Sequence, residues 1–287
     1  MYLFHRRHLA AIKKLILKSI ISSTYDNRYL YFIPICVWAW NKLGVDVICF
    51  MPYLKDGIDG YNPDKDKREK YYLIIDTLDG LGIELQTVPF SAPEHKEATY
   101  AQCSRLYAAC LDLPEDEILI TGDVDMAMFQ IPPYIDKITI FGNDLVPEGQ
   151  FPMCYASGTV KEWKSVFNLH GKTYQQCLDE LLGAIECDHF RGNYWGKDQQ
   201  TLWENTKENT TLINRARPGT QFANSRYDRD DAYILERLNP DTIDYHMNRP
   251  GYEPQNFEII LTILKYHYPN DDFTWLVDYT NEYKKLL

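Results

Sequence analysis

The chain has 287 residues, enough for one large α/β domain or two small ones, and its 45% hydrophobic and 25% charged residues are ordinary for a globular protein. Its formal net charge of −11 argues against general nucleic-acid binding, which needs a positively charged surface. An acidic protein that binds a phosphorylated ligand therefore needs a metal ion, or a few local Arg and Lys side chains, to offset the repulsion.

The first two thirds of the chain alternates strand-like and helical patterns, as in an α/β layered domain. A strand at 15–21 is followed by a polar turn at 22–27, an amphipathic helix at 29–43 and a strand at 45–51, whose nearly continuous apolar sequence is typical of a sheet covered on both faces. Residues 55–70 are polar and contain Gly and Pro, which predicts a loop. A helix at 71–81, a strand at 83–88, a helix at 94–111 and a fourth strand at 117–121 follow.

The later elements are expected as strands at 138–141 and 153–157 and helices at 160–168, 174–186, 198–207, 257–268 and 273–287. The sequence shows no internal repeat, no low-complexity tract and no clear interdomain linker. We therefore expect a single α/β domain with a helical C-terminal extension.

The seven Cys residues are scattered without a CxxC pair, and most lie in apolar stretches, which favours reduced thiols and a cytoplasmic protein over a disulfide framework. Residues 1–21 contain an apolar run interrupted by Lys13, Lys14 and Lys18. This run is too short and too charged for a transmembrane helix, and it lacks a small-residue cleavage site. We expect no transmembrane segment, while weak contact of this basic stretch with a membrane surface stays an open alternative.

Two carboxylates directly follow the fourth predicted strand. The sequence EILIT at 117–121 leads into GDVDM, so Asp123 and Asp125 lie at the carboxyl end of a buried strand, where open α/β sheets bind their ligands. Residues i and i+2 of an extended segment face the same side, so both carboxylates can converge on one cation, and Mg²⁺ or Mn²⁺ prefers such oxygen ligands. Gly122 lets a ligand approach the backbone closely. The alternative interpretation is a solvated acidic turn that caps a helix.

Residues 99–126 resemble the corresponding region of GT-A-fold glycosyltransferases, and of the glycogenin-like, family-8-type enzymes in particular. That region has an Ala-x-x-Arg-Leu-like helix, a Leu-Pro turn, an apolar strand and then the two aspartates. The matching pieces here are Ala101 to Arg105-Leu106, Leu113-Pro114, residues 118–120, and Asp123 with Asp125. The resemblance implies a GT-A (Rossmann-like) fold with a mixed, mostly parallel sheet flanked by helices. It also implies one domain over 1–287, with a nucleotide-binding half at 1–126, an acceptor and donor-sugar half at 127–256, and a helical segment at 257–287.

Three later segments resemble further motifs of the family. The sequence YASG at 155–158 resembles the Asn-Ser-Gly segment that lines the acceptor and donor-sugar region, with Ala156 in place of Asn. The sequence GKDQQTL at 196–202 resembles the Asp-Gln helix start beneath the donor sugar. The sequence YHMNRPG at 245–251 resembles the late His-x-x-Gly-x-x-Lys-Pro-Trp motif, in which the His is the third metal ligand. The Lys-Pro-Trp portion is missing, so Arg249 would supply the charge that contacts the diphosphate.

The resemblance thus implies a transferase that takes a nucleoside-diphosphate sugar as donor, UDP-sugar favoured, with Mn²⁺ or Mg²⁺ as cofactor. The expected metal ligands are Asp123, Asp125 and His246. The expected donor-binding residues are Ser23, Thr24, Tyr25, Asn27, Arg105, Asp123, Val124, Ser157 and Arg249. The acceptor is expected to be a glycan, a protein or a small molecule, and the sequence fixes neither its identity nor the oligomeric state.

Asp198 and Gln199 are the expected catalytic residues. Glycosyl transfer passes through an oxocarbenium-like state with a nucleoside diphosphate as leaving group, whose charge a metal would neutralise. Asp198 would deprotonate the acceptor hydroxyl in an inverting enzyme, or stabilise the sugar cation in a retaining one, and the resemblance favours retention. Gln199 would contact a sugar hydroxyl. The alternative role of Asp198 is to cap the helix that follows it.

Several other residues have structural alternatives. In the turn at 22–27, Tyr25 stacking on a base and Asn27 bonding to base or ribose compete with simple turn formation. Arg105 has the alternative of an ion pair on an exposed helix face. The loop at 55–70 is a candidate lid. The sequence YDRDD at 227–231 is interpreted as solvated surface, or else as an acceptor contact.

Functions of other classes also stay open. A non-catalytic protein with a degenerate GT-A fold would bind a carbohydrate or nucleotide-sugar without turnover. Haloacid-dehalogenase-like phosphatases also place two aspartates after a strand, but near the N-terminus and followed by Thr or Val where this chain has Ala127. A sugar-nucleotide pyrophosphorylase needs a Gly-rich loop after the first strand, and the sequence SSTYDN contains no Gly.

Overall fold

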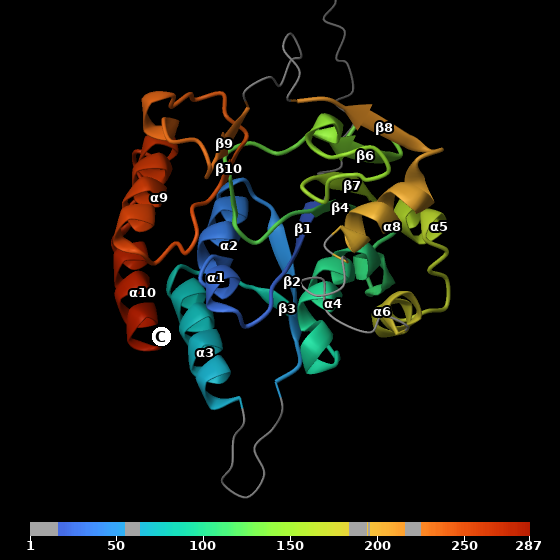
Figure 1. Cartoon of the computed structure of the whole chain (residues 1–287), viewed down its shortest axis with the longest axis horizontal. Helices are drawn as coiled ribbons and strands as arrows, with labels where there is room; N and C mark the ends of the chain where they lie inside the picture. The colour runs from blue at the N-terminus through green and yellow to red at the C-terminus, as the bar shows by residue number, and fades with distance from the viewer. Residues whose placement is uncertain (1–16, 55–63, 184–193, 195, 216–224) are drawn as a thin grey trace, which may run out of the picture.

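The computed structural model describes residues 17–54, 64–183, 194, 196–215 and 225–287 (Figure 1). A seven-stranded sheet lies at its centre, in the order β3-β2-β1-β4-β7-β6-β8. These strands are β1 (Leu17–Ser22), β2 (Asp46–Pro52), β3 (Gln86–Phe90), β4 (Ile118–Thr121), β6 (Ile138–Phe141), β7 (Ala156–Thr159) and β8 (Thr210–Ile213). The first four run parallel, β7 is antiparallel to β4 and β6, and β8 is parallel to β6. This is the mixed, mostly parallel sheet that was expected.

The strand order changes direction at β1. The chain moves outward from β1 to β2 and β3, then returns to place β4 on the other side of β1. At such a switch point the connections leave in opposite directions, so a crevice opens beyond the carboxyl ends of the two central strands. The residues that follow β1 and β4 are therefore neighbours, as the hydrogen bond from Gly122 N to Ile20 O at 2.9 Å shows.

A second sheet of three short strands carries the late sequence motif to the same crevice. It consists of β5 (Met126–Met128), β10 (Asp244–His246) and β9 (Arg226–Asp228), in that order, with β10 antiparallel to β5 and parallel to β9. His246 pairs with Met126, and Met247 N donates to Asp125 O at 2.9 Å. Residues more than 100 positions apart in the sequence are thus brought together by backbone pairing.

Helices cover both faces of the central sheet (Figure 1). One face carries α1 (Asn27–Leu30), α2 (Ile33–Lys42), α3 (Lys65–Gly80), α9 (Pro254–His267) and α10 (Thr274–Lys285). The other face carries α4 (Glu97–Ser104), the 3₁₀ helix Arg105–Cys110, α5 (Val160–Val166), α6 (Tyr174–Leu182) and α8 (Lys197–Thr206). Short 3₁₀ turns lie at Glu94–Lys96, Asn143–Leu145 and Ile234–Glu236.

Two apolar cores result, because successive side chains of a strand point to opposite faces. Ile21 and Ile120 pack into the core under α2, while Ile20 and Leu119 pack into the core under α4. The helices around the second core begin at clear local signals. Both α5 and α6 start with a capping box, formed by Thr159 with Glu162 and by Thr173 with Gln176.

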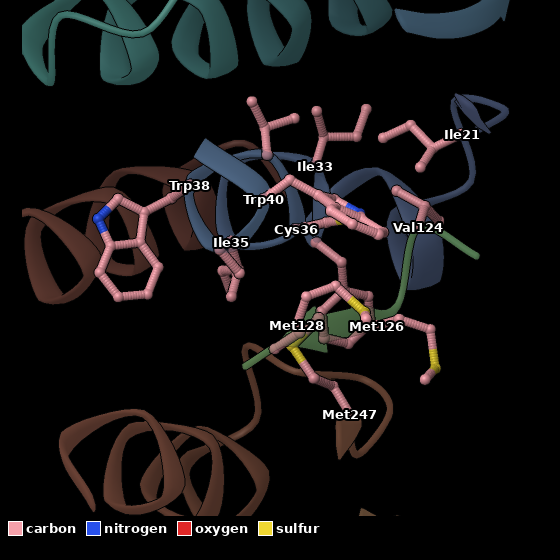
Figure 2. Packing of buried hydrophobic residues seen from close by; sticks show 14 of the residues in the cluster. Ile21, Ile33, Ile35, Cys36, Trp38, Trp40, Val124, Met126, Met128 and Met247 are labelled. Carbon is pink, nitrogen blue, oxygen red and sulfur yellow. The ribbon is translucent and has the colours of Figure 1, made fainter. Parts of the chain in front are cut away.

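The buried helix α2 packs against the segment that carries Asp123 and Asp125. Cys36 and Trp40 of α2 belong to the same core cluster as Met126, Met128 and Met247, and Figure 2 shows these side chains between α2 and the strands below it. The Cys36 sulfur also lies 3.8 Å from the backbone oxygen of Asp123. This packing holds the backbone of Asp123 and Asp125 in place.

Several predicted elements differ from the structure. The helix expected at 29–43 is two helices, and α2 is not amphipathic, since all residues from Ile33 to Trp40 are buried between the sheet and the C-terminal helices. Residues 65–70 of the predicted loop form the start of α3, because the charged residues there are good helix formers on an exposed surface. The remainder of that loop, 55–63, lies outside the described residues. The helix expected at 94–111 changes to a 3₁₀ helix at Arg105.

Other boundaries shift by a few residues. The strand expected at 83–88 spans Gln86–Phe90, and the strand expected at 153–157 is β7, which begins at Ala156. Residues 184–186 of the helix expected at 174–186, and residues 1–16 of the basic N-terminal stretch, are outside the described part of the chain. Among the helices that are described, none has the length and apolar character to cross a membrane. The six Cys residues of the described ranges are free thiols, as expected, and Cys187 lies outside those ranges.

Candidate active site

A cavity of about 270 Å³ opens beyond the carboxyl ends of β1 and β4. Its walls come from segments that are far apart in the sequence: the turn after β1, the helix α4, the two-aspartate segment, the start of α8, and the segments around β9 and β10. The lining residues that matter for its chemistry are Ser22, Ser23, Thr24, Asp26, Tyr29, Arg105, Asp123, Val124, Asp125, Asp198, Gln199, Arg226, Arg229, His246 and Arg249.

Arg105 joins two carboxylates on one side of the cavity. Its Nη1 donates to Asp123 Oδ1 at 2.5 Å and to Gly122 O at 2.8 Å, and its Nη2 donates to Asp198 Oδ2 at 2.8 Å. The Arg105 side chain is only 5% exposed. The alternative of an exposed helix residue is therefore wrong, although Arg105 does form ion pairs. A planar, permanently charged fork is suited to holding two carboxylates in a fixed relation.

Asp198 is the most buried carboxylate of the cavity, with a side chain that is 2% exposed. Asp198 is the second residue of α8, and the N-cap of this helix is Gly196. Asp198 therefore does not take the capping position considered above. Its Oδ1 accepts from Gln199 N at 2.8 Å, while Oδ2 accepts from Arg105. Burial raises the pKa of the Asp198 carboxyl to about 6, against the opposing effect of Arg105. Gln199 lies beside it and lines the same cavity.

Asp125 is surrounded by positively charged groups. Its Oδ2 lies 2.8 Å from Arg229 Nη1, 3.3 Å from His246 Nε2 and 3.4 Å from Arg249 Nε. Burial would raise the pKa of the Asp125 carboxyl, but the hydrogen bond with His246 and the charges of Arg249 and Arg229 bring it well below its ordinary value. The carboxylate is therefore ionised over the whole physiological range.

His246 stands between two carboxylates. Its Nδ1 lies 3.8 Å from Asp228 Oδ2, on the side opposite Asp125. Burial lowers the pKa of the imidazole, but the hydrogen bonds with Asp125 and Asp228 outweigh it and raise the value to about 9. The ring is thus held in place by its two acidic neighbours.

The donor types at this point are those that a hard divalent cation accepts, because Asp123, Asp125 and His246 supply carboxylate oxygens and an imidazole nitrogen at one cavity. The oxygens have other partners in the structure, namely Arg105 at Asp123 and three basic groups at Asp125. Within the described ranges, no three His, Cys, Asp or Glu side chains are arranged as a metal-binding group.

The structure brings most of the predicted residues into the cavity but leaves three outside its lining. Ser157 is buried in β7, where its hydroxyl donates to Thr139 O at 3.5 Å. Asn27 begins α1, and its amide oxygen accepts from Lys70 Nζ at 2.9 Å, so it links α1 to α3. Tyr25 lies in the turn with its ring 5.8 Å from Lys67 Nζ. Ser23 and Thr24 do line the cavity.

Two arginines of the cavity were missed by the sequence analysis. Arg229 belongs to the segment 227–231 that was interpreted as solvated surface, yet it lines the cavity and pairs with Asp125. Arg226 lines the cavity too and pairs with the buried Asp244 at 3.1 Å. The available signal was the need for local basic residues in a chain of net charge −11.

No family model matches the chain, and no curated protein matches it. Among solved structures, the glycosyltransferase GlyE of Streptococcus pneumoniae TIGR4 aligns with a TM-score of 0.50 and 15% identity, over 94% of this chain and 64% of the GlyE chain. The galactosyltransferase LgtC, solved with donor and acceptor sugar analogs, aligns with a TM-score of 0.47 and 10% identity, over 86% of this chain and 95% of its own. A glycosyltransferase involved in glycosylation of the major capsid of PBCV-1 aligns with a TM-score of 0.37 and 9% identity, over 80% and 92% of the two chains.

The likeness to GlyE concerns the fold, since the identity is low and this chain spans less than two thirds of GlyE. It agrees with the mixed, mostly parallel sheet and its flanking helices described above. The chain therefore has the α/β fold of a GT-A-type glycosyltransferase, as its sequence resemblance implied.

Proposed function

We propose that this protein is a glycosyltransferase that moves a sugar from a nucleoside-diphosphate sugar, with a UDP-sugar favoured, to an acceptor hydroxyl, assisted by Mn²⁺ or Mg²⁺. The observation that carries the proposal is the convergence of Asp123, Asp125, His246, Arg105 and Asp198 on one cavity at the switch point of the sheet. These residues come from four separate parts of the chain. Ordinary stability does not require so many charged groups to meet at one cavity, and their desolvation is costly.

The donor diphosphate would lie against the two-aspartate segment. A divalent cation held by Asp123, Asp125 and His246 would neutralise the charge that develops on the leaving diphosphate. Arg249 lies on the same wall of the cavity and can donate hydrogen bonds to phosphate oxygens. Its guanidinium is 4.9 Å from the ring of Tyr29, which supports it from the side of α1.

The nucleoside would extend toward the turn after β1. Ser22, Ser23 and Thr24 line this end of the cavity, and Tyr29 provides an aromatic surface there. The hydroxyl of Ser23 donates to Thr24 O at 2.8 Å, which holds the turn compact. Val124, between the two aspartates in the sequence, also lines the cavity. This arrangement supports binding of a ribose and base between the turn and Val124.

The donor sugar would lie above Asp198 and Gln199. Both oxygens of Asp198 already accept hydrogen bonds, one from Arg105 and one from the backbone of Gln199. Such a carboxylate is better suited to stabilising positive charge on the sugar ring than to removing a proton from an acceptor. This favours a retaining outcome over an inverting one, with Gln199 contacting a sugar hydroxyl.

A thermal-shift screen of nucleotide-sugars with Mn²⁺ tests the proposal, with Asp125→Asn as the test variant. Asp278→Ala is the control, since Asp278 is exposed on α10. We expect one class of donor to raise the Tm of the wild type and of Asp278→Ala, and to leave the Tm of Asp125→Asn unchanged. The absence of any donor-specific shift in the wild type, or an equal shift in Asp125→Asn, would contradict the proposal.

Measuring the release of nucleoside diphosphate distinguishes a glycosyltransferase from a non-catalytic binding protein. A binding protein with a degenerate GT-A fold would show the same Tm shift with the donor, but no release of nucleoside diphosphate. We expect the bound donor to be turned over, slowly with water and faster with its acceptor.

A further inference from the structure

Three basic groups compete for one carboxylate oxygen. Arg229 Nη1, His246 Nε2 and Arg249 Nε all have Asp125 Oδ2 as their acidic partner, at 2.8, 3.3 and 3.4 Å. The carboxylate is 5% exposed, whereas the side chains of Arg229 and Arg249 are 20% and 23% exposed. The two arginine side chains are thus more exposed than the carboxylate that they contact, and all three residues line the cavity.

Two guanidinium groups share this one carboxylate. Asp125 pairs with both Arg229 and Arg249, whereas Asp228 faces the imidazole of His246 at 3.8 Å and Asp26, which also lines the cavity, pairs with Arg28 at 2.7 Å. Arg229 and Arg249 leave the backbone on either side of β10, one after β9 and the other in the loop that follows His246. Both arginines line the cavity, so an anion there can accept hydrogen bonds from either guanidinium group.

A divalent cation cannot bind Asp125 Oδ2 while the three basic groups hold that oxygen. Binding of the cation to Oδ2 would require Arg229 and Arg249 to move away from that oxygen. Once displaced, both guanidinium groups would remain within a few ångströms of a second positive charge, which is unfavourable by Coulomb repulsion. An anion with several oxygens, such as a diphosphate, removes this repulsion because it offers the displaced guanidinium groups hydrogen-bond partners.

We infer that Arg229 and Arg249 are exchangeable counter-ions of Asp125, and that they make binding of the cation depend on the diphosphate of the donor. Before ligands bind, the two arginines neutralise Asp125. When the diphosphate and the cation enter together, the cation takes over Asp125 and the arginines turn to the phosphate oxygens. The inference rests on the proposed function for the identity of the anion, and it gives Arg229 a donor-binding role.

Isothermal titration calorimetry on Arg229→Gln tests this inference, with the full chain and MnCl₂ or UDP as titrants. Without nucleotide, we expect Arg229→Gln to bind Mn²⁺ about fivefold more tightly than the wild type, the change expected when one partly exposed ion pair no longer competes. In EDTA, we expect the same variant to bind UDP about fivefold more weakly, because a phosphate partner is lost. A merely structural role for Arg229 would not change the two affinities in opposite directions.

Arg237→Gln is the matched control, because Arg237 lies in the same region and pairs with Asp231 at 3.2 Å, but its side chain is 66% exposed. It should leave both affinities unchanged. The inference is overturned if Arg229→Gln weakens both affinities or changes neither, or if the wild type binds Mn²⁺ equally well with and without UDP.

The Mn²⁺ titration also separates the two proposals. If the wild type bound no nucleoside diphosphate, the proposed function would fail, while the tighter binding of Mn²⁺ alone to Arg229→Gln would still support the counter-ion role. If UDP bound but Mn²⁺ alone bound no more tightly to the variant, the counter-ion role would fail and the proposed function would stand.

Discussion

Arg105 shows how one side chain can organise the candidate site. It reaches from the start of a 3₁₀ helix to the backbone of Gly122 and to the carboxylates of Asp123 and Asp198. The two carboxylates come from different elements, and Arg105 sets their separation. Asp198, whose side chain is 2% exposed, depends on this charge, because an unpaired buried carboxylate is strongly unfavourable.

The ionisation of Asp198 should control the acidic limb of activity. Its pKa is raised to about 6, mainly by burial, and the proposed role requires the ionised form. We therefore expect kcat/KM for donor turnover to fall as the pH drops through 6. Initial rates across pH 4.5 to 8, at constant ionic strength, measure this.

The ionisation of the Asp198 carboxyl should also lower the stability of the folded protein as the pH rises, whereas it raises activity. Because its pKa is higher in the folded protein than in the unfolded chain, its contribution to stability is full below the ordinary value near 3.8 and is lost as the pH rises through 6. Asp198→Asn should remove this part of the pH dependence of Tm. A rate limb near pH 4, or a Tm profile that is the same in both proteins, would contradict the assignment.

Residues next to a strong local signal could be predicted from the sequence. Asp123 and Asp125 follow a four-residue buried strand after Gly122, and the carboxyl end of that strand fixes their position. Arg229 could not be predicted, because its place depends on the pairing of β9 with β10, which joins segments that carry only three strand residues each. Tyr25 and Asn27 were predicted to contact the nucleotide, and neither lines the cavity; Asn27 contacts α3 instead.

At the scale of elements, the loop after β10 depends on close packing against the junction of α1 and α2. A Cβ atom at Gly251 would lie 2.6 Å from ring atoms of both Tyr31 and Phe32. Both rings are buried, so neither can move freely. The same loop carries Arg249, so this packing helps to position the donor-binding wall.

Gly251→Ala should therefore destabilise the protein by about 1–3 kcal/mol, the usual cost of an extra methyl group in a packed interior. Urea unfolding gives this free energy directly. Gly80→Ala is the control, because Gly80 ends α3 and a Cβ atom there meets nothing within 4 Å. Equal stability of the two variants would show that the loop is not packed as described.

The elements that could be predicted best were those with a continuous apolar sequence. The strands β2 and β4 are buried along almost their whole length, and their sequences DVICFMP and ILIT are mostly apolar. The start of α3 was predicted as a loop, because residues 65–70 carry no apolar periodicity; there an exposed helix includes the ion pair between Lys65 and Glu69 at 3.7 Å. Helix formation in such a segment depends on local propensity and not on burial.

At the scale of the whole molecule, a buried charge network ties the small sheet to the large one. Arg215, which follows β8, bonds both oxygens of Asp244 on β10 at 3.0 Å, and Arg226 on β9 bonds the same two oxygens at 3.1 Å. Arg215 and Asp244 are almost fully buried. The network fixes the wall that carries His246 relative to the central sheet.

Asp244→Asn should destabilise the fold by about 3–5 kcal/mol, because it leaves two guanidinium groups without their charged partner in the interior. Asp241→Asn is the control, since Asp241 is exposed in the segment that leads to β10. Chemical unfolding of both variants measures the difference. A loss in Asp244→Asn no larger than in Asp241→Asn would mean that the network is not needed to join the two sheets.

The alternation of strands and helices was enough to predict the fold class, because layered α/β domains follow from that order. The wall of the cavity that residues 225–249 form could not be predicted in full. It depends on how residues 225–249 return to the two-aspartate segment through a three-stranded sheet, and such long-range pairing leaves little trace in a local pattern.

The central claim is that the cavity binds and turns over a nucleotide-sugar. Its most direct test is a proton NMR time course of the purified protein with Mn²⁺ and each of a panel of UDP- and GDP-sugars. We predict that the anomeric signal of one donor disappears with release of its nucleoside diphosphate, and that Asp125→Asn abolishes this change while remaining folded. A folded wild-type protein that consumes none of the donors, with or without added glycan acceptors, would contradict the account.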